Sequence, residues 1–189
     1  MKKLSIYLFL VFLSFSVSTY ADDANDFEID GISIGDNLLD YYSASEISEA
    51  YEYKYKNDKF RYYVLNTKSG STYDFIQITI KSPIKGFLVS QYDKLIIHSI
   101  AGIIRYKFNI DDCYPVQDRI KEELDLFFKI DGTRGSKSHA MDKTKKSINK
   151  YVHYYLDADS DYAGVTIHCY DMSKEIEDTG FYDQLHLDI

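Results

Sequence analysis

The residues that come nearest to a catalytic pattern are Gly31, Ser33 and Gly35, which match the G-x-S-x-G motif of a nucleophile elbow. In that motif a serine, placed on a sharp turn between a strand and a helix, attacks an acyl carbon. Ser33 lies too near the chain start for the strands that an α/β-hydrolase places before its elbow, and flanking isoleucines crowd the turn. We expect a tight turn leading into a capped helix. A hydrolase using Ser33 is kept as an alternative, and no catalytic residue is assigned.

A second pattern is the alternation of Asp157, Asp159 and Asp161, which resembles the opening of a calcium loop. An EF-hand places glycine next and glutamate at the twelfth loop position, where this chain has Tyr162 and His168. The pattern therefore predicts a solvated hairpin turn. Weak calcium binding by the three aspartates is the alternative, and no other metal or cofactor is expected.

Positive charge gathers in residues 129–150, within an acidic protein. The candidate anion-binding residues are Arg134, Lys137, Lys143, Lys145 and Lys146. A P-loop is excluded because the glycine spacing is too short and the segment follows a predicted helix rather than a strand. We expect a solvated loop or loose helix here, with an anion or acidic-partner site as the alternative.

The five histidines show no H-x-x-x-H or H-x-H spacing. Two of them, His153 and His168, fall in a predicted hairpin over residues 151–170. Pairing Leu156 with Asp161 places these imidazoles roughly 13 Å apart, too far to share one zinc ion. The sequence therefore predicts no metal site.

The first residues of the chain combine the parts of a secretory signal peptide. Two lysines follow Met1, residues 4–17 carry no charge, and an acidic stretch begins at Asp22. The apolar run is shorter than the roughly 20 residues that cross a bilayer. We predict a leader over residues 1–21 that is cut after Ala21. This releases residues 22–189, with no membrane span, to the periplasm or the exterior.

The composition limits the class of partner. The chain has 30 acidic and 22 basic residues, a net charge of −8 that becomes more negative once the leader and its two lysines are removed. An acidic surface argues against a general nucleic-acid binder. The mature length suits a single domain with a full core.

Cys113 and Cys169 are the only cysteines. Cys113 shares an apolar helical stripe with Val116, Ile120, Leu124 and Phe127, and Cys169 lies on the apolar face of a predicted strand. An even cysteine count in an exported chain predicts a disulfide between them. Two buried free thiols are the alternative.

The order of predicted elements indicates an α+β fold. Apolar alternation predicts strands over residues 27–30, 51–56, 60–65, 73–81, 94–109, 151–156, 162–170 and 184–189. Helices are expected over residues 38–42, with Asp36 as N-cap, over 43–50, from the capping box of Ser43 and Glu46, and over about 112–129. Strands joined by tight turns pair antiparallel, so we expect one antiparallel sheet with these helices packed on one face.

The segment 27–41 reads F-x-I-x-G-I-S-I-G-D-x-L-L-D-Y. With residues 100–102, 113–114 and 169–171, it resembles a group of small exported bacterial proteins to which no activity is attached. The resemblance implies bacterial export and supplies no catalytic residues. We therefore expect a non-enzymatic binding domain of the bacterial envelope that contacts an unidentified protein or glycan.

Overall fold

The computed structural model describes residues 27–55, 59–81, 94–107, 109–156 and 164–189. The predicted leader, its cut after Ala21 and the candidate calcium ligands Asp157, Asp159 and Asp161 lie outside the described residues. The strands are β1 (Glu28–Ile29), β2 (Ile32–Ser33), β3 (Tyr51–Lys54), β4 (Phe60–Asn66), β5 (Phe75–Lys81), β6 (Ile97–Arg105), β7 (Thr133–Ser138), β8 (Ile148–Tyr155), β9 (Gly164–Asp171) and β10 (Gln184–Asp188). The helices are α2 (Ala44–Glu49), α3 (Cys113–Phe128) and α4 (Lys174–Glu177), with 3₁₀ turns η3 (Leu38–Asp40) and η5 (Ile110–Asp112).

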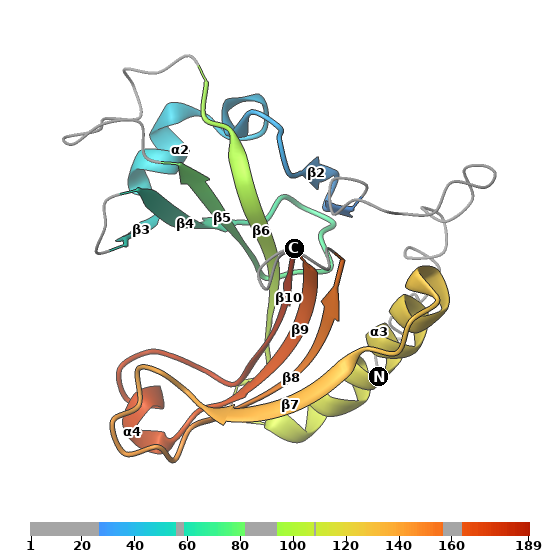
Figure 1. Cartoon of the computed structure of the whole chain (residues 1–189). Coiled ribbons are helices and arrows are strands. Elements are labelled where there is room, and N and C mark those ends of the chain that lie inside the picture. Colours follow the sequence, from blue (N-terminus) through green and yellow to red (C-terminus); the bar gives the residue numbers. More distant parts are fainter. Residues whose placement is uncertain (1–26, 56–58, 82–93, 108, 157–163) are drawn as a thin grey trace.

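Eight strands form one sheet in the order β3-β4-β5-β6-β10-β9-β8-β7. Each neighbouring pair is antiparallel, which confirms the predicted α+β class with an antiparallel sheet. The last strand, β10, lies in the middle, where Leu187 is opposite Gly102 of β6 and Ile167 of β9. The C-terminal strand therefore joins the two halves of the sheet (Figure 1).

The sheet is strongly bent, and the long helix α3 lies on its convex side (Figure 1). Strand alternation sends Ile167, Cys169 and Leu185 to that side, where they are almost fully buried. Ile47 of α2 and Leu124 of α3 belong to the same hydrophobic core. Helices α2 and α3 therefore cover one face, and the opposite, concave face of the sheet is left to carry other side chains.

A disulfide joins the start of α3 to the sheet. Cys113 and Cys169 are bonded, their Cα atoms are 6.0 Å apart, and both residues are fully buried. The predicted pairing is thereby confirmed. Such a bond fits a periplasmic or extracellular protein, because disulfides persist in oxidising compartments. Among the described residues, no helix is long and apolar enough to cross a membrane.

The burial of Gln117 differs from the amphipathic pattern predicted for α3. The sequence places it on the polar side of the helix, yet it is only 3% exposed. Its Nε2 donates to the carbonyl oxygens of Lys150 and Ile167, each at 3.0 Å. The side chain therefore hydrogen-bonds strands β8 and β9 to the helix, as a buried amide must if it is to be tolerated.

Residues 131–149 were expected to form a loop or loose helix, and this was wrong for residues 133–138 and 148–149, whereas residues 139–147 do form a loop. Residues 133–138 form strand β7, which pairs with β8 from Thr133 opposite His153 to Ser138 opposite Ile148. Almost every residue of β7 is exposed, and β7 is an edge strand of the sheet. When the side chains on both faces of a strand are exposed to solvent, apolar and polar residues need not alternate. The sequence therefore carries no strand pattern for β7.

The predicted register of the β8–β9 hairpin was wrong by two residues. His153 is opposite Thr166, and His168 is opposite Tyr151. The predicted N-cap at Asp36 was also wrong. Asn37 caps the first 3₁₀ turn, while Asp36 accepts hydrogen bonds from the Ser33 amide and the Tyr41 hydroxyl. The capping box of Ser43 and Glu46 is confirmed.

Gly102 of β6 is required by a close contact with an aromatic ring rather than by a bulge or bend. A Cβ atom at this position would lie 2.3 Å from the Tyr73 ring. The register shift between β5 and β6 lies elsewhere, between Thr79 and Ile80. Gly102 therefore leaves the space in which an aromatic ring packs over the middle of the sheet.

Candidate functional site

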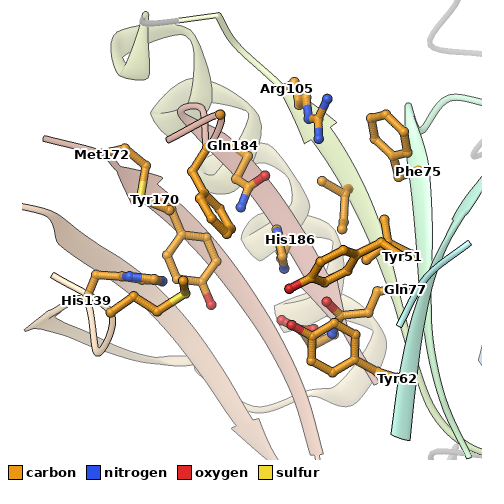
Figure 2. A pocket seen from close by; sticks show the side chains of 16 residues that line it. Tyr51, Tyr62, Phe75, Gln77, Arg105, His139, Tyr170, Met172, Gln184 and His186 are labelled. Atoms are coloured by element: carbon orange, nitrogen blue, oxygen red, sulfur yellow. The ribbon is translucent and has the colours of Figure 1, made fainter. Parts of the chain in front are cut away.

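The concave face of the sheet holds a groove of about 500 Å³. Its lining comes from both halves of the sheet, since β3 and β4 form one wall and β9 contributes to the other, with β10 between them. Figure 2 shows Tyr51, Tyr62 and Gln77 facing Tyr170 and His139 across this space, with Gln184 and His186 between them. The lining residues are Tyr51, Tyr62, Val64, Phe75, Gln77, Ile103, Arg105, His139, Met141, Tyr170, Met172, Gly180, Phe181, Gln184, His186 and Asp188.

Four tyrosines at one side of the groove form what we call the tyrosine platform: Tyr51, Tyr53, Tyr55 and Tyr62. The Tyr53 and Tyr62 rings are stacked, with centroids 5.0 Å apart and planes at 19°. Tyr55 meets both rings edge-on. Tyr51 and Tyr62 also line the groove, so the platform continues the groove outward along the edge strand β3.

The platform is more exposed than the sequence predicts. The alternation of tyrosines in residues 51–55 predicts rings that are half-buried against a helix or neighbouring strands. They do pack against Tyr62 of the neighbouring strand, yet Tyr51 is 60% exposed and Tyr53 and Tyr55 are each 41% exposed. The reason is topological, because β3 is the edge of the sheet and the helices lie on the other face.

Beside the deep part of the groove, two strands bring His168 and Asp188 together. His168 Nε2 lies 3.3 Å from an Asp188 carboxylate oxygen, and the Asn149 amide lies 3.0 Å from His168 Nδ1. A neutral imidazole with its proton on Nε2 satisfies both contacts, donating to Asp188 and accepting from Asn149. This arrangement fixes the orientation of the His168 ring.

Burial sets the protonation of this cluster. It lowers the pKa of His168 to about 4, with help from Lys137 and His153. It lowers the pKa of His186 to about 3 and raises that of Asp188 to about 7. The Asp188 side chain is 32% exposed, but that surface opens into the groove rather than onto a convex face in bulk water. The histidines near the groove are therefore neutral at pH 7.

Tyr170 organises the histidine side of the groove. Its ring stacks on His168 at 5.3 Å and meets His139 and His186 edge-on at 5.2 Å and 4.9 Å. Two buried ring nitrogens there, His139 Nδ1 and His186 Nε2, have no hydrogen-bond partner among the described residues. A buried polar atom without a partner costs about 1–3 kcal/mol. The histidine side of the groove therefore has two ring nitrogens whose hydrogen bonds are not satisfied within the described residues.

The predicted anion-binding residues do not converge on one site. Arg134 forms an ion pair with Asp118 of α3 at 2.7 Å, whereas Lys137 lies over the Tyr151 ring at 5.3 Å. These two residues extend to opposite faces of β7, since they are three positions apart on one strand. Lys146 pairs with Glu175 at 2.5 Å.

The other two candidates, Lys143 and Lys145, are exposed in the turn between β7 and β8. Buried Asp142 orders that turn by accepting hydrogen bonds from the amides and hydroxyls of Thr144 and Ser147. These bonds lower the pKa of the Asp142 carboxyl well below its usual range. The basic residues are thus distributed over a strand and a structured turn.

Ser33 lies on the short strand β2, which pairs with β1. The turn between them has positive φ angles at Asp30 (53°) and Gly31 (75°), the pattern of a type I′ hairpin turn. The expected tight turn is therefore present, but it joins two strands, whereas a nucleophile elbow joins a strand to a helix. Ser33 is not among the residues that line the groove.

No group of three or more histidine, cysteine, aspartate or glutamate residues in the described ranges is placed to hold a metal ion.

The groove itself was not predicted from the sequence. One signal for it is visible in hindsight, since Gln184, His186 and Asp188 alternate with apolar residues and so form a polar face on a strand.

Comparison with known proteins adds no further assignment, since the chain matches no protein-family model, no curated protein and no solved structure at a significant level.

Proposed function

We propose that this protein is an exported, non-enzymatic binding domain of the bacterial envelope, and that its ligand occupies the groove on the concave face of the sheet. The observation that carries the proposal is the groove of about 500 Å³, rimmed by exposed tyrosine rings. Ligand sites are concave and largely apolar, with a few polar groups that fix orientation. Tyr51, Gln184 and His186 provide that combination in one place.

The proposal of export draws support from two independent features. The Cys113–Cys169 disulfide suits an oxidising compartment. The predicted leader over residues 1–21 supplies a route to such a compartment.

Binding rather than turnover is proposed because of which side chains line the groove. Among the described residues, the lining contains one carboxylate, Asp188, and no serine, threonine or cysteine. Covalent catalysis by a hydroxyl or thiol needs such a nucleophile next to a base. Hydrolysis of glycosides generally needs a pair of carboxylates.

Hydroxyl-radical footprinting tests the proposal. The full chain, expressed with its own leader and purified, is oxidised in buffer and in an envelope extract of the cells that make it. Tyr51 and Met141, both exposed in the groove, should be protected several-fold by the extract. Leu126 of α3, 80% exposed on the other face, is the control: because the extract scavenges hydroxyl radicals, the dose is adjusted until Leu126 is oxidised equally in both samples. Equal oxidation of Tyr51 and Met141 with and without extract would contradict the proposal.

A further inference from the structure

We infer that the ligand of this groove is a neutral glycan, bound as a chain that runs from the His186 side of the groove onto the tyrosine platform. The inference rests on the proposed function and specifies its ligand class. Three features carry it: the exposed aromatic faces, the hydrogen-bonding character of the lining and the charge of the protein.

The tyrosine platform offers what a sugar ring needs for stacking. Tyrosine supplies a rigid, amphipathic contact surface at low conformational-entropy cost. Tyr51 is 60% exposed, with its ring centroid 6.4 Å from that of Tyr62, so most of its surface is open to a ligand. Pyranose rings present C–H groups on their faces, and these pack favourably against the negative face of an aromatic ring.

The polar groups of the groove suit hydroxyls rather than charges. The amides of Gln77 and Gln184 each offer two donors and an acceptor, and a neutral histidine offers one of each. Burial holds His186 neutral by lowering its pKa to about 3. A hydroxyl both donates and accepts, so a polyhydroxylated ligand can satisfy groups of either kind.

Two buried histidine nitrogens without hydrogen-bond partners also favour a polyhydroxylated ligand. His186 Nε2 and His139 Nδ1 are covered and make no hydrogen bond among the described residues, although both rings belong to the groove lining. A side-chain shift of the kind that commonly accompanies binding would bring a ligand hydroxyl to them. Their unmet capacity would then be satisfied on binding.

Charge argues against an anionic glycan. The protein carries a net charge of −8, and Asp188, whose pKa burial raises to about 7, adds a partly ionised carboxyl to the groove at neutral pH. The lining guanidinium of Arg105 lies over the Phe75 ring at 4.2 Å and the Tyr182 ring at 5.2 Å, so it is already engaged by two aromatic faces. A polyanion would be repelled at long range, whereas a neutral chain would not.

The geometry also indicates an extended ligand. Tyr51 and Tyr62 line the groove, while Tyr53 lies further along β3 and Tyr55 directly follows that strand, both outside the groove. A ligand confined to the groove would leave those two rings uncovered. A chain of several sugar units would contact both the groove and the outer rings, which provides more than one stacking position.

Isothermal titration calorimetry with maltohexaose, cellohexaose and chitohexaose tests the inference on the purified full chain. At least one of the three should bind, and a hexamer of galacturonic acid, an anionic sugar, should bind at least tenfold more weakly than that one. Tyr51→Ala, on one side of the groove, and Gln184→Ala, on the strand between its two sides, should each weaken binding about tenfold or more. Tyr155→Ala is the matched control, because Tyr155 is 54% exposed but does not line the groove.

Three results would overturn the inference: no binding of any neutral hexamer, stronger binding of the anionic one, or equal effects of Tyr51→Ala and Tyr155→Ala. The footprinting experiment separates this failure from failure of the proposed function. If an envelope extract protects Tyr51 while every neutral hexamer fails to bind, the groove has a ligand of another class, such as a protein segment. If no neutral hexamer binds and the extract also fails to protect Tyr51, both the proposed function and the glycan inference are contradicted.

Discussion

His168 Nε2 lies 3.3 Å from the carboxylate of Asp188, across two strands that meet in the middle of the sheet. The contact depends on β10, the last strand of the chain, lying beside β9. In the register of this pair His186 is opposite His168, and Asp188 is opposite Thr166. The C-terminal strand therefore completes both the sheet and the polar part of the groove.

This cluster predicts how stability changes between about pH 4 and pH 6.5. The folded protein holds His168 and His186 neutral, with pKa values of about 4 and 3, whereas the unfolded chain protonates them near 6.5. Their contribution to stability is therefore lost as the pH falls through this range. Asp188 acts in the opposite sense, since its raised pKa of about 7 favours the folded state at low pH and this contribution is lost as the pH rises.

Urea unfolding at several pH values measures the effect. His168→Gln should reduce the rise of unfolding free energy with pH by up to about 1.4 kcal/mol per pH unit, because one titrating group is removed. Asp188→Asn should make that rise steeper than in the wild type. Identical pH slopes for the wild type and His168→Gln would show that His168 is not held neutral by the fold.

The disulfide predicts a large loss of stability when it is removed. Replacing Cys113 and Cys169 by alanine should lower the free energy of unfolding by about 4 kcal/mol, since the bond closes a long loop, with a sequence separation of 56. Urea denaturation measures this loss, and reduced wild-type protein serves as the control because it should be destabilised to a similar extent. A loss below about 1 kcal/mol would contradict the account.

Gln117→Leu should destabilise the protein by about 1–3 kcal/mol. The substitution removes the donor to the carbonyls of Lys150 and Ile167 and leaves buried acceptors without that partner. Glu122→Leu, at an exposed position of the same helix, is the matched control and should change stability by less than about 0.5 kcal/mol. If the two variants had equal stability, the amide of Gln117 would have no structural role.

The hydrolase alternative has a direct test at Ser33. Because the serine lies in a β-hairpin and does not line the groove, Ser33→Ala should change neither oligosaccharide binding nor any hydrolysis of model esters by the purified protein. Ester turnover by the wild type that disappears in Ser33→Ala would instead establish Ser33 as a nucleophile. Hydrolysis that is equal in both proteins would exclude Ser33 as the nucleophile.

Local sequence patterns were enough for much of the fold. Strict alternation in residues 51–56 and 73–81 gave strands β3 and β5, because a half-buried strand must alternate. The Ser43 and Glu46 spacing gave the start of α2, because both bonds of a capping box are local. The pairing of Cys113 with Cys169 followed from two apolar faces that had to meet.

Features set by long-range packing were missed. Strand β7 is polar throughout, and only its pairing with β8 makes it a strand. Gln117 is buried because strand carbonyls lie above it, which no helical periodicity records. The groove depends on the bend of the sheet and on the central place of β10, so residues as distant in sequence as Tyr51 and His186 line it together.

The central claim, that a ligand occupies the concave groove, is tested most directly by site-specific photocrosslinking in the cells that make the protein. A photoreactive phenylalanine analogue is placed at Tyr51, in the groove, and separately at Leu126, which is exposed on α3. The account predicts a crosslinked adduct from position 51 and none from position 126 at matched expression. Adducts of equal yield from both positions, or none from position 51, would contradict it.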